Sequence, residues 1–155
     1  AEACDGFDQM REREGEKLAE DVRNRASVIE TLVGEVEKRS PERVAEYREK
    51  LLARMREVLE STDIDETRIV TEAAIYADKT AVDEETVRLR SHLHQLDGML
   101  NEVKPVGRKL DFLVQEMNRE ANTIGSKAND VEMAQTVVNI KSEIEKIREQ
   151  IQNIE

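Results

Sequence analysis

Apolar residues recur at helical spacing near the start of the chain, and charged residues occupy the remaining faces. The stripe consists of Leu18, Val22, Ile29, Val33 and Val36. Spacings of three, four and seven are typical of one face of a helix, so the pattern predicts a long amphipathic helix from about Asp8 to Lys38. Ser40 and Pro41 then combine a hydroxyl that can cap a helix with a proline suited to the first helical position. We therefore expect a break there and a second helix that ends near Ser61.

Capping patterns mark the starts of the next two helices. Asp63 can cap a third, short helix, and Glu66 three residues later can reach back toward the free amide groups. Thr80 and Asp83 repeat this spacing before a fourth helix, whose apolar stripe runs up to Pro105. Proline removes a backbone hydrogen bond and clashes with the preceding turn. The fourth helix is therefore expected to end at this proline.

Two further helices are expected after the proline. The fifth should begin at about Val106 and stop near Gly125, because glycine is a weak helix former. Asn129 and Glu132 can cap the last helix. Its isoleucines alternate spacings of four and three: Ile140, Ile144, Ile147, Ile151 and Ile154. This is the spacing of a heptad seam, so we expect these isoleucines to be buried against another helix.

No segment alternates apolar and polar residues as a strand does, and the predicted fold is therefore all-α. We expect an elongated helical bundle whose first and last helices are long, amphipathic and coiled-coil-like. Residues 1–79 would form a long helical hairpin plus a short helix, and residues 80–155 a C-terminal helical region within one continuous domain. The long apolar stripes need partners, so self-association is expected.

Composition and charge limit the kind of site that the chain can build. Of its 155 residues 38% are hydrophobic and 38% charged, with two Tyr, two Phe and no Trp. So few aromatic side chains make a deep apolar cavity improbable and favour an open, polar site. The net charge of −11 argues against nucleic-acid binding over the whole surface but allows a local basic patch.

Several classes of chemistry and location lack their sequence signatures. The single cysteine, Cys4, has no partner for a disulfide, which fits a reducing compartment. No long apolar run or signal-peptide pattern is present, so we expect a cytoplasmic protein without a membrane segment. A glycine-rich phosphate loop, a G-x-S-x-G turn and an H-E-x-x-H pair are also missing from the sequence. Polar chemistry is instead concentrated in two places.

The first place is the stretch from Lys79 to His94, which holds both histidines of the chain. Glu84, Arg88 and His92 are spaced four residues apart and line one helix face. Carboxylates and an imidazole together can bind a divalent ion. At a rise of 1.5 Å per residue, however, Glu84 and His92 lie about 12 Å apart, so one ion needs ligands from another helix or chain. A solvated face with Glu–Arg pairs is the simpler interpretation of this stretch alone.

The second place is the segment from Gly107 to Lys127, which is slightly basic within a strongly acidic chain. Glu116 and Glu120 are one helical turn apart and can share a cation or orient a water. Amide and hydroxyl side chains crowd the same segment: Gln115, Asn118, Asn122 and Thr123. Helix propensity does not favour Asn and Thr, so their abundance indicates a function.

The same segments resemble a known family. GRKLDFLVQEMNREANTIGSKAND and the terminal KIREQIQNIE are similar to the C-terminal signature of the bacterial YicC family. DEETVRLRSHLHQLDGML resembles its E-E-x-x-R-L-x-x-H block, and Met10, Arg11, Glu14 and Gly15 resemble its M-R-x-x-E-G segment. The resemblance implies the C-terminal half of an endoribonuclease about twice as long, which uses a divalent metal and assembles as a ring-like hexamer. Lys79 and Ala81 depart from the family's usual Arg and Asp.

The leading hypothesis is therefore metal-dependent hydrolysis of RNA, with Mn²⁺ or Mg²⁺ as cofactor and no DNA substrate expected. The candidate metal ligands are Glu84, Glu85, His92, Glu116 and Glu120, of which His92, Glu116 and Glu120 are also the candidate catalytic groups. The candidate RNA-binding residues are Arg88, Arg108, Lys109, Asn118, Arg119, Asn122 and Lys127. Two alternatives stay open: an oligomerisation and RNA-docking scaffold without catalysis of its own, and a structural coiled-coil adaptor.

Overall fold

The structure is a computed structural model that describes the backbone of residues 2–59, 63–102 and 107–154, with side chains from residue 6 to residue 153. Over these ranges the chain forms helices and no strand, which confirms the all-α prediction. The helices are α1 (Glu2–Leu59), α2 (Glu66–Thr80), α3 (Asp83–Leu100), α4 (Gly107–Lys127) and α5 (Val131–Ile154).

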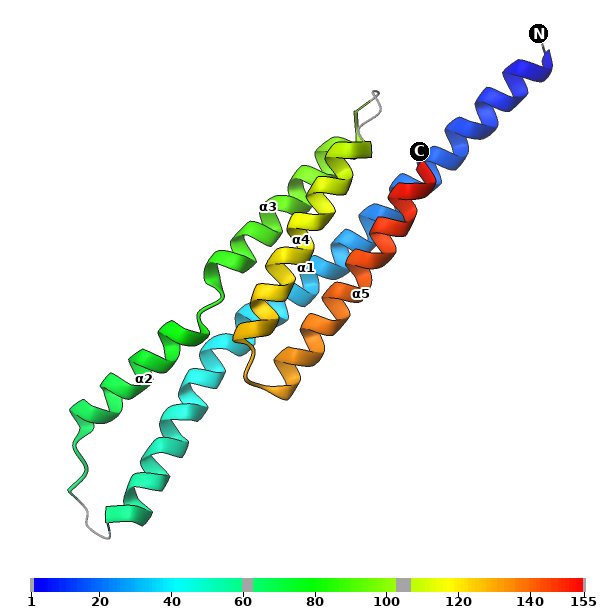
Figure 1. The fold of residues 1–155 in the computed structure, drawn as a ribbon. Coiled ribbons are helices and arrows are strands. Elements are labelled where there is room, and N and C mark those ends of the chain that lie inside the picture. The colour runs from blue at the N-terminus through cyan, green and yellow to red at the C-terminus, as the bar shows by residue number, and fades with distance from the viewer. Residues whose placement is uncertain (1, 60–62, 103–106, 155) are drawn as a thin grey trace.

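α1 runs the length of an elongated molecule and organises the other helices (Figure 1). α1, α3, α4 and α5 form a four-helix bundle, because α3 packs on α1 and α4, and α5 packs on α4 and α1. α2 lies beyond the bundle, beside the C-terminal part of α1. Among the described residues, no helix combines the length and apolar character that crossing a membrane would require.

The predicted helix break at Ser40 and Pro41 is wrong, because α1 continues through Pro41 without interruption. Proline loses one hydrogen bond, but the residues on both sides are held by the bundle. Val36 is fully buried before it and Arg43 is 3% exposed after it. Tertiary packing therefore outweighs the local signal at Pro41. In this half of the chain, the two helices that pack antiparallel to each other are α1 and α2.

The caps of two helices lie one or two residues from their predicted positions. α2 is capped by Asp65 rather than Asp63, and its carboxylate accepts a hydrogen bond from the Thr67 amide at 3.0 Å. α5 is capped by Asp130 rather than Asn129, with the Met133 amide donating at 3.1 Å. In both cases a neighbouring residue of the same capping type takes the role.

The ends around α3 and α4 differ in part from the predicted ones. α3 ends at Leu100 rather than at Pro105, because the amides of Asn101 and Glu102 close the last turn on the carbonyls of Gly98 and Met99. Thr80 belongs to the last turn of α2, where its hydroxyl donates to the Tyr76 carbonyl at 2.8 Å, so it does not cap α3. α4 begins at Gly107, next to the predicted start; Val106 and Pro105 lie outside the described residues. Gly125 does not end α4. A β-carbon at Gly125 would lie 3.2 Å from the Val137 side chain, so glycine permits α4 and α5 to approach closely.

The bundle core confirms the seam predicted for the last helix. Ile140, Ile144, Ile147 and Ile151 are at most 1% exposed and pack between α1 and α4; the side chain of Ile154 is outside the described set. The stripe of α1 joins them, since Val22, Ile29, Val33 and Val36 are all buried. These positions orient every helix of the bundle and so decide which polar residues face one another.

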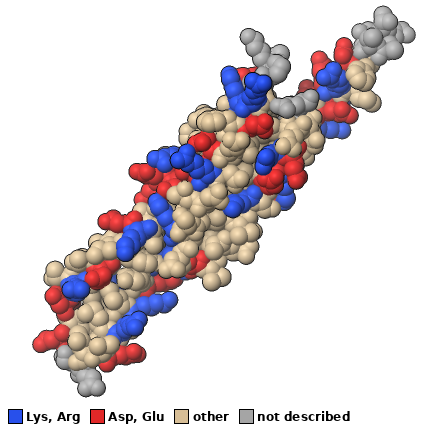
Figure 2. All heavy atoms as spheres, in the orientation of Figure 1, with Lys and Arg blue, Asp and Glu red and all other residues tan. Residues whose placement is uncertain are grey.

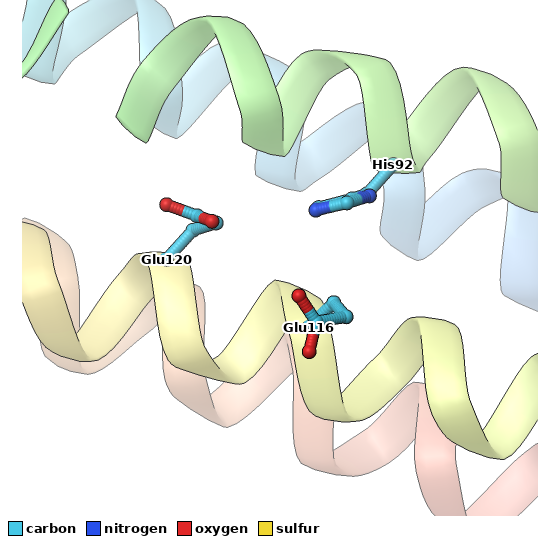
Figure 3. Close-up of side chains that lie close together, drawn as sticks. All are labelled: His92, Glu116 and Glu120. Atoms are coloured by element: carbon cyan, nitrogen blue, oxygen red, sulfur yellow. The ribbon is translucent and has the colours of Figure 1, made fainter. Parts of the chain in front are cut away.

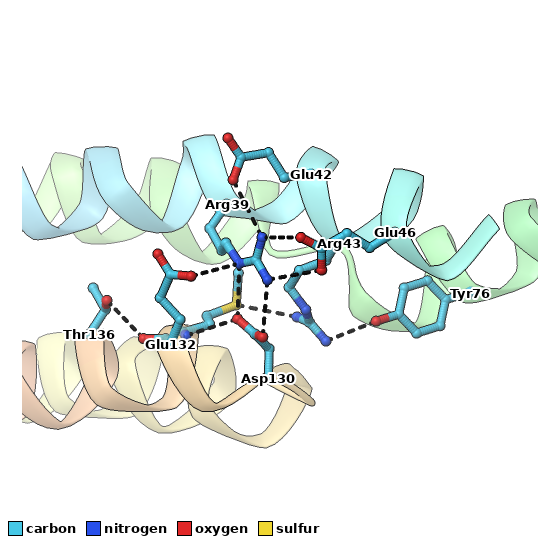
Figure 4. Close-up of polar contacts among 9 residues, drawn as sticks. Arg39, Glu42, Arg43, Glu46, Tyr76, Asp130, Glu132 and Thr136 are labelled. Atoms are coloured by element: carbon cyan, nitrogen blue, oxygen red, sulfur yellow. Dashed lines mark hydrogen bonds and ion pairs between the residues drawn. The ribbon is translucent and has the colours of Figure 1, made fainter. Parts of the chain in front are cut away.

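Charged side chains tie α1 to the start of α5 at a place that we call the Arg39 junction (Figure 4). The Arg39 guanidinium donates to Glu46 at 2.7 and 3.0 Å and to Asp130 at 3.1 and 3.2 Å. Glu42 at 3.5 Å and Glu132 at 3.3 Å complete its surroundings. The hydrogen bond from Arg39 holds the pKa of Asp130 below its usual range. Each acidic group at the junction therefore has a cationic partner.

Arg43 extends this junction toward α2. Its guanidinium donates to the Tyr76 hydroxyl at 3.0 Å and contacts the Met133 sulfur at 3.4 Å. The ring of Tyr76 stacks on that of Tyr47 with centroids 4.0 Å apart. Half of the aromatic residues are thus used to join α1 and α2 rather than to line a pocket.

Candidate metal and RNA site

Three potential metal ligands converge between α3 and α4. α3 presents His92, and α4 presents Glu116 and Glu120 from successive turns; the three side chains point toward one another (Figure 3). One ligand atom from each lies within 4.8 Å of the others. The sequence indicated that an ion bound by His92 needs ligands from another helix or chain, and α4 is a helix that brings two carboxylates next to His92.

The buried stripes of the two helices set this arrangement. Leu89, Leu93 and Leu96 turn one face of α3 into the core, which leaves His92 at the edge that faces α4. On α4, Leu113 and Met117 are buried beside Glu116, and the same register brings Glu120 to the helix contact. Polar residues next to a core stripe are therefore carried into the interface between helices.

The three groups make no side-chain hydrogen bond or ion pair with any residue that the structure describes. In the described ranges, no side-chain hydrogen bond or ion pair is made by Glu116 or Glu120, and Glu120 is only 6% exposed. His92 Nδ1 is buried and has no hydrogen-bond partner either. A buried carboxylate without a compensating charge is unfavourable. The donor set of two carboxylates and one imidazole fits a divalent cation.

The separation of the three groups is consistent with such an ion. Two ligands that each contact an ion at about 2.1 Å from opposite sides lie about 4.2 Å apart. The limit of 4.8 Å among the three groups can therefore be closed by small side-chain rotations. The imidazole favours a transition ion such as Mn²⁺ over Mg²⁺, which prefers oxygen ligands.

The three potential ligands line a polar cavity of about 330 Å³, which we call the α3–α4 cleft. Its other walls are Glu85, Arg88, Arg119 and Thr123. Glu85 is 5% exposed; its Oε1 accepts a hydrogen bond from Lys127 Nζ at 2.7 Å, whereas its Oε2 is buried without a partner. The cleft thus combines carboxylates with two guanidinium groups.

A second hollow of about 450 Å³ adjoins the cleft along α4, and we call its lining the α4 polar strip. It consists of Gln115, Asn118, Arg119, Asn122, Thr123 and Ser126. Arg119 and Thr123 line both hollows, so the two are adjacent. Asn118 Oδ1 is buried in the strip and has no hydrogen-bond partner among the described residues.

The remaining predicted residues are placed in three ways. Glu84 is directed to solvent, where Arg88 donates to it at 3.1 Å, and it is not among the converging ligands. Lys127 is held by Glu85 and by the Ala81 carbonyl at 2.9 Å. Arg108 and Lys109 are exposed at the start of α4 and make no ion pair with any described residue.

Sequence reasoning missed the contact between Lys127 and Glu85, which are 42 residues apart. It listed Lys127 as an RNA-binding group and Glu85 as a metal ligand, whereas the structure pairs them with each other. No local pattern indicates such a contact. The only available signal was the presence of a lysine and several glutamates in the two polar segments.

Acidic and basic side chains intermix over the face shown in Figure 2, which carries no extended basic area. α4 itself differs from this average. It contains four basic residues and three acidic ones (Arg108, Lys109, Arg119 and Lys127 against Asp111, Glu116 and Glu120), in a chain of net charge −11. α4 therefore repels a polyanion less than the chain as a whole does.

Together these features describe an all-α protein in which two neighbouring helices of a four-helix bundle bring an imidazole and two carboxylates to one polar cleft. A sequence model of the family described as endoribonuclease YicC-like, C-terminal, matches residues 36–155. The chain belongs to this family.

Two curated relatives agree with this assignment. A protein of Clostridioides difficile called probable endoribonuclease YicC is 52% identical over 148 residues, which cover 95% of this chain and 50% of the relative. A protein of the same name from Haemophilus influenzae is 38% identical over 149 residues, covering 96% of this chain and 51% of the relative. The chain therefore spans about half the length of the relatives it matches.

Proposed function

We propose that this chain carries the metal-dependent active site of an endoribonuclease, which hydrolyses phosphodiester bonds of RNA. One observation carries the proposal: His92, Glu116 and the buried Glu120 converge from two helices and have no partners among the described residues. The names of the two curated relatives support RNA as the substrate. A purely structural adaptor has no need of such a group.

In this proposal His92, Glu116 and Glu120 hold a divalent cation. When bound, such an ion supplies Lewis-acid activation of water and neutralises charge on the phosphate. Arg88 and Arg119 line the same cleft and would contact the nonbridging phosphate oxygens, as guanidinium groups commonly do. These contacts hold the scissile phosphate beside the carboxylates.

Glu85 and Lys127 have a supporting role in this scheme. The Lys127 ammonium neutralises part of the negative charge of Glu85, while the second oxygen of that carboxylate remains available to a water or to the ion's outer shell. Glu84 is excluded from the ligand set because its side chain is 78% exposed and paired with Arg88. This refines the wider ligand set expected from the sequence.

The test compares Glu116→Gln/Glu120→Gln with the unaltered chain on a structured RNA, in Mn²⁺, Mg²⁺ or EDTA. Glutamine keeps the size of glutamate and its helix preference but removes the charge that binds a cation. We expect metal-dependent cleavage to fall by about 100-fold or more, with RNA affinity in EDTA and melting temperature retained. Glu149→Gln, the same change on an exposed residue of α5 that makes no ion pair with a described residue, is the matched control and should cleave normally.

Unchanged cleavage by the double variant would remove these carboxylates from the mechanism. A second candidate function, an RNA-docking scaffold, is favoured by the fact that the chain spans about half of its relatives' length. It predicts RNA binding by the chain without cleavage under any metal condition. Cleavage by a longer form that includes the preceding residues, but not by this chain, would support the scaffold.

We also propose that the protein self-associates, and that the longer form does so as the hexamer that the family resemblance implies. Apolar side chains support this, because several are exposed on the helices: Phe7, Met10, Val70, Ile75, Val87 and Val131. Of these, Phe7 and Met10 are three residues apart and so lie on one face of α1, and contiguous exposed apolar side chains often mark contacts between subunits. Light scattering should give a mass above that of a monomer; a monomer at micromolar concentration would contradict the proposal for this chain.

A further inference from the structure

Phe112 is an exposed aromatic residue on a helix face that is otherwise polar. Its side chain is 62% exposed, although the chain has only four aromatic residues in all, two Tyr and two Phe. The two tyrosines are stacked on each other beside α1. Phe112 is therefore an aromatic ring left open to solvent on α4, the helix that carries both metal-binding carboxylates.

Viewed down the axis of α4, this ring points between the direction of the cleft and that of the α4 polar strip, although it lies before the first α4 residue that lines either hollow. Successive residues turn by about 100° around a helix axis. Viewed down the helix axis, the direction of Phe112 lies about 40° from that of Glu116. The direction of Arg119 lies about 60° from that of Glu116, turned the same way. Gln115 and Asn122 follow at about 100° and 120°. Along the axis, the Cα of Phe112 lies about 6 Å from that of Glu116.

We infer that Phe112 is a stacking platform for an unpaired nucleobase next to the scissile phosphate, so that the preferred substrate is RNA that is single-stranded at the cleavage position. This inference rests on the proposed function. Bases that are not paired stack on aromatic side chains, and sequence-tolerant RNA binders combine such rings with basic groups along the backbone.

The neighbours of the ring supply the other contacts that a single strand needs. Arg108, one turn before Phe112, and Arg119, two turns after it, are exposed cations without an ion pair among the described residues; they would contact phosphates on either side of the stacked base. The side-chain amides of Gln115, Asn118 and Asn122 would form hydrogen bonds with the edges of the bases. Asn118 has a buried oxygen without a partner in this strip.

A base-paired helix suits this surface less well. In a duplex the base faces are covered by their neighbours, and a protein reaches mainly phosphates and 2′-hydroxyls. An exposed ring then has no partner to stack on. Phe112 should accordingly contribute to binding of single-stranded RNA and contribute little to binding of a duplex.

The experiment measures binding in EDTA, so that cleavage plays no part. Fluorescence anisotropy gives the affinity of the chain for a labelled oligouridylate and for a fully paired RNA duplex of the same length. Phe112→Ala should weaken binding of the single strand about tenfold or more and leave that of the duplex within twofold. Phe112→Tyr should bind like the unaltered chain, whereas Phe112→Leu should behave like the alanine variant.

Val138→Ala is the control, because Val138 is also an exposed apolar side chain (57%) but lies on α5, away from α4's polar strip. It should leave both affinities unchanged. Single-strand affinity that survives Phe112→Ala, or that leucine restores fully, would overturn the inference. A fall in molecular mass on light scattering together with equal losses for both RNAs would instead assign Phe112 to a contact with a second copy of the chain.

The outcome is separable from that of the proposed function. Failure of Glu116→Gln/Glu120→Gln to reduce cleavage would contradict the metal site but not the stacking measured in EDTA. Normal loss of cleavage in that variant, with Phe112→Ala indistinguishable from the unaltered chain on both RNAs, would contradict only the stacking.

Discussion

The Arg39 junction and the α3–α4 cleft are built from the same kinds of residue but treat them in opposite ways. At the junction, one guanidinium binds Glu46 and Asp130 at 2.7–3.2 Å, and Asp130 also caps α5. In the cleft, His92, Glu116 and Glu120 face one another without a partner in the described ranges. Both places join neighbouring helices of one bundle, but only at the junction do the described charged groups pair with one another.

The difference separates charges that are paired within the described fold from charges that are not. Paired charges satisfy one another and add their hydrogen bonds to the stability of the fold. Converging acidic groups without a cation are unfavourable by themselves, and a binding partner relieves that cost. Changes at the junction should therefore alter stability, and changes in the cleft should alter metal binding.

The largest expected effect concerns the histidine of the cleft. His92→Gln removes the imidazole ligand and should weaken Mn²⁺ binding by about 100-fold, with little change in melting temperature measured without metal. Titration calorimetry gives the affinity. His94→Gln is the matched control, because His94 is exposed on the same helix and lies outside the ligand group. Equal Mn²⁺ affinity in the His92 variant would show that the cleft does not bind the ion through this residue.

A smaller effect is expected at the junction. Asp130→Ala removes the α5 cap and the partner of Arg39 together, and loss of such a cap alone lowers stability by about 1 kcal/mol. Asp130→Asn keeps a capping side chain but removes the charge, so its loss should be smaller. Urea unfolding measures both. If alanine and asparagine have equal effects, the cap contributes nothing and the ion pair accounts for the whole role of Asp130.

The smallest effect is the response to acid of the carboxyl groups that are paired with basic side chains, two of which belong to the junction. Hydrogen bonds from basic side chains lower the pKa values of four carboxyl groups: Glu37, Glu46, Asp130 and Glu143. A lowered pKa in the folded state means that these groups stabilise the fold above the unfolded carboxyl pKa of about 4. That contribution should be lost as the pH falls further.

Melting temperatures between pH 6 and pH 3 test this expectation. The unaltered chain should lose stability below about pH 4, and Asp130→Asn should lose less over the same range because one of the four groups no longer titrates. A steeper acid response in the asparagine variant would contradict the assignment of Asp130 to the paired set.

The sequence by itself determined the helices, their apolar faces and one side of the candidate site. Helical periodicity is a local property, since 3.6 residues per turn places side chains three and four positions apart on one face. Glu116 and Glu120 are neighbours for this reason, and the isoleucine stripe of α5 is buried as its spacing predicts. Composition likewise predicted a polar, open site, and both hollows of α4 are lined by polar side chains.

The tertiary structure decided the rest, because neither the neighbours of a helix nor its rotation against them is encoded within a few residues. His92 reaches Glu116 and Glu120 only because the core turns α3 and α4 toward each other. Lys127 meets Glu85 across 42 residues for the same reason. Pro41 lies inside α1, although its local signal favours a break, because buried contacts on both sides hold the helix together. Long-range packing outweighs local preference wherever many contacts oppose one unfavourable residue.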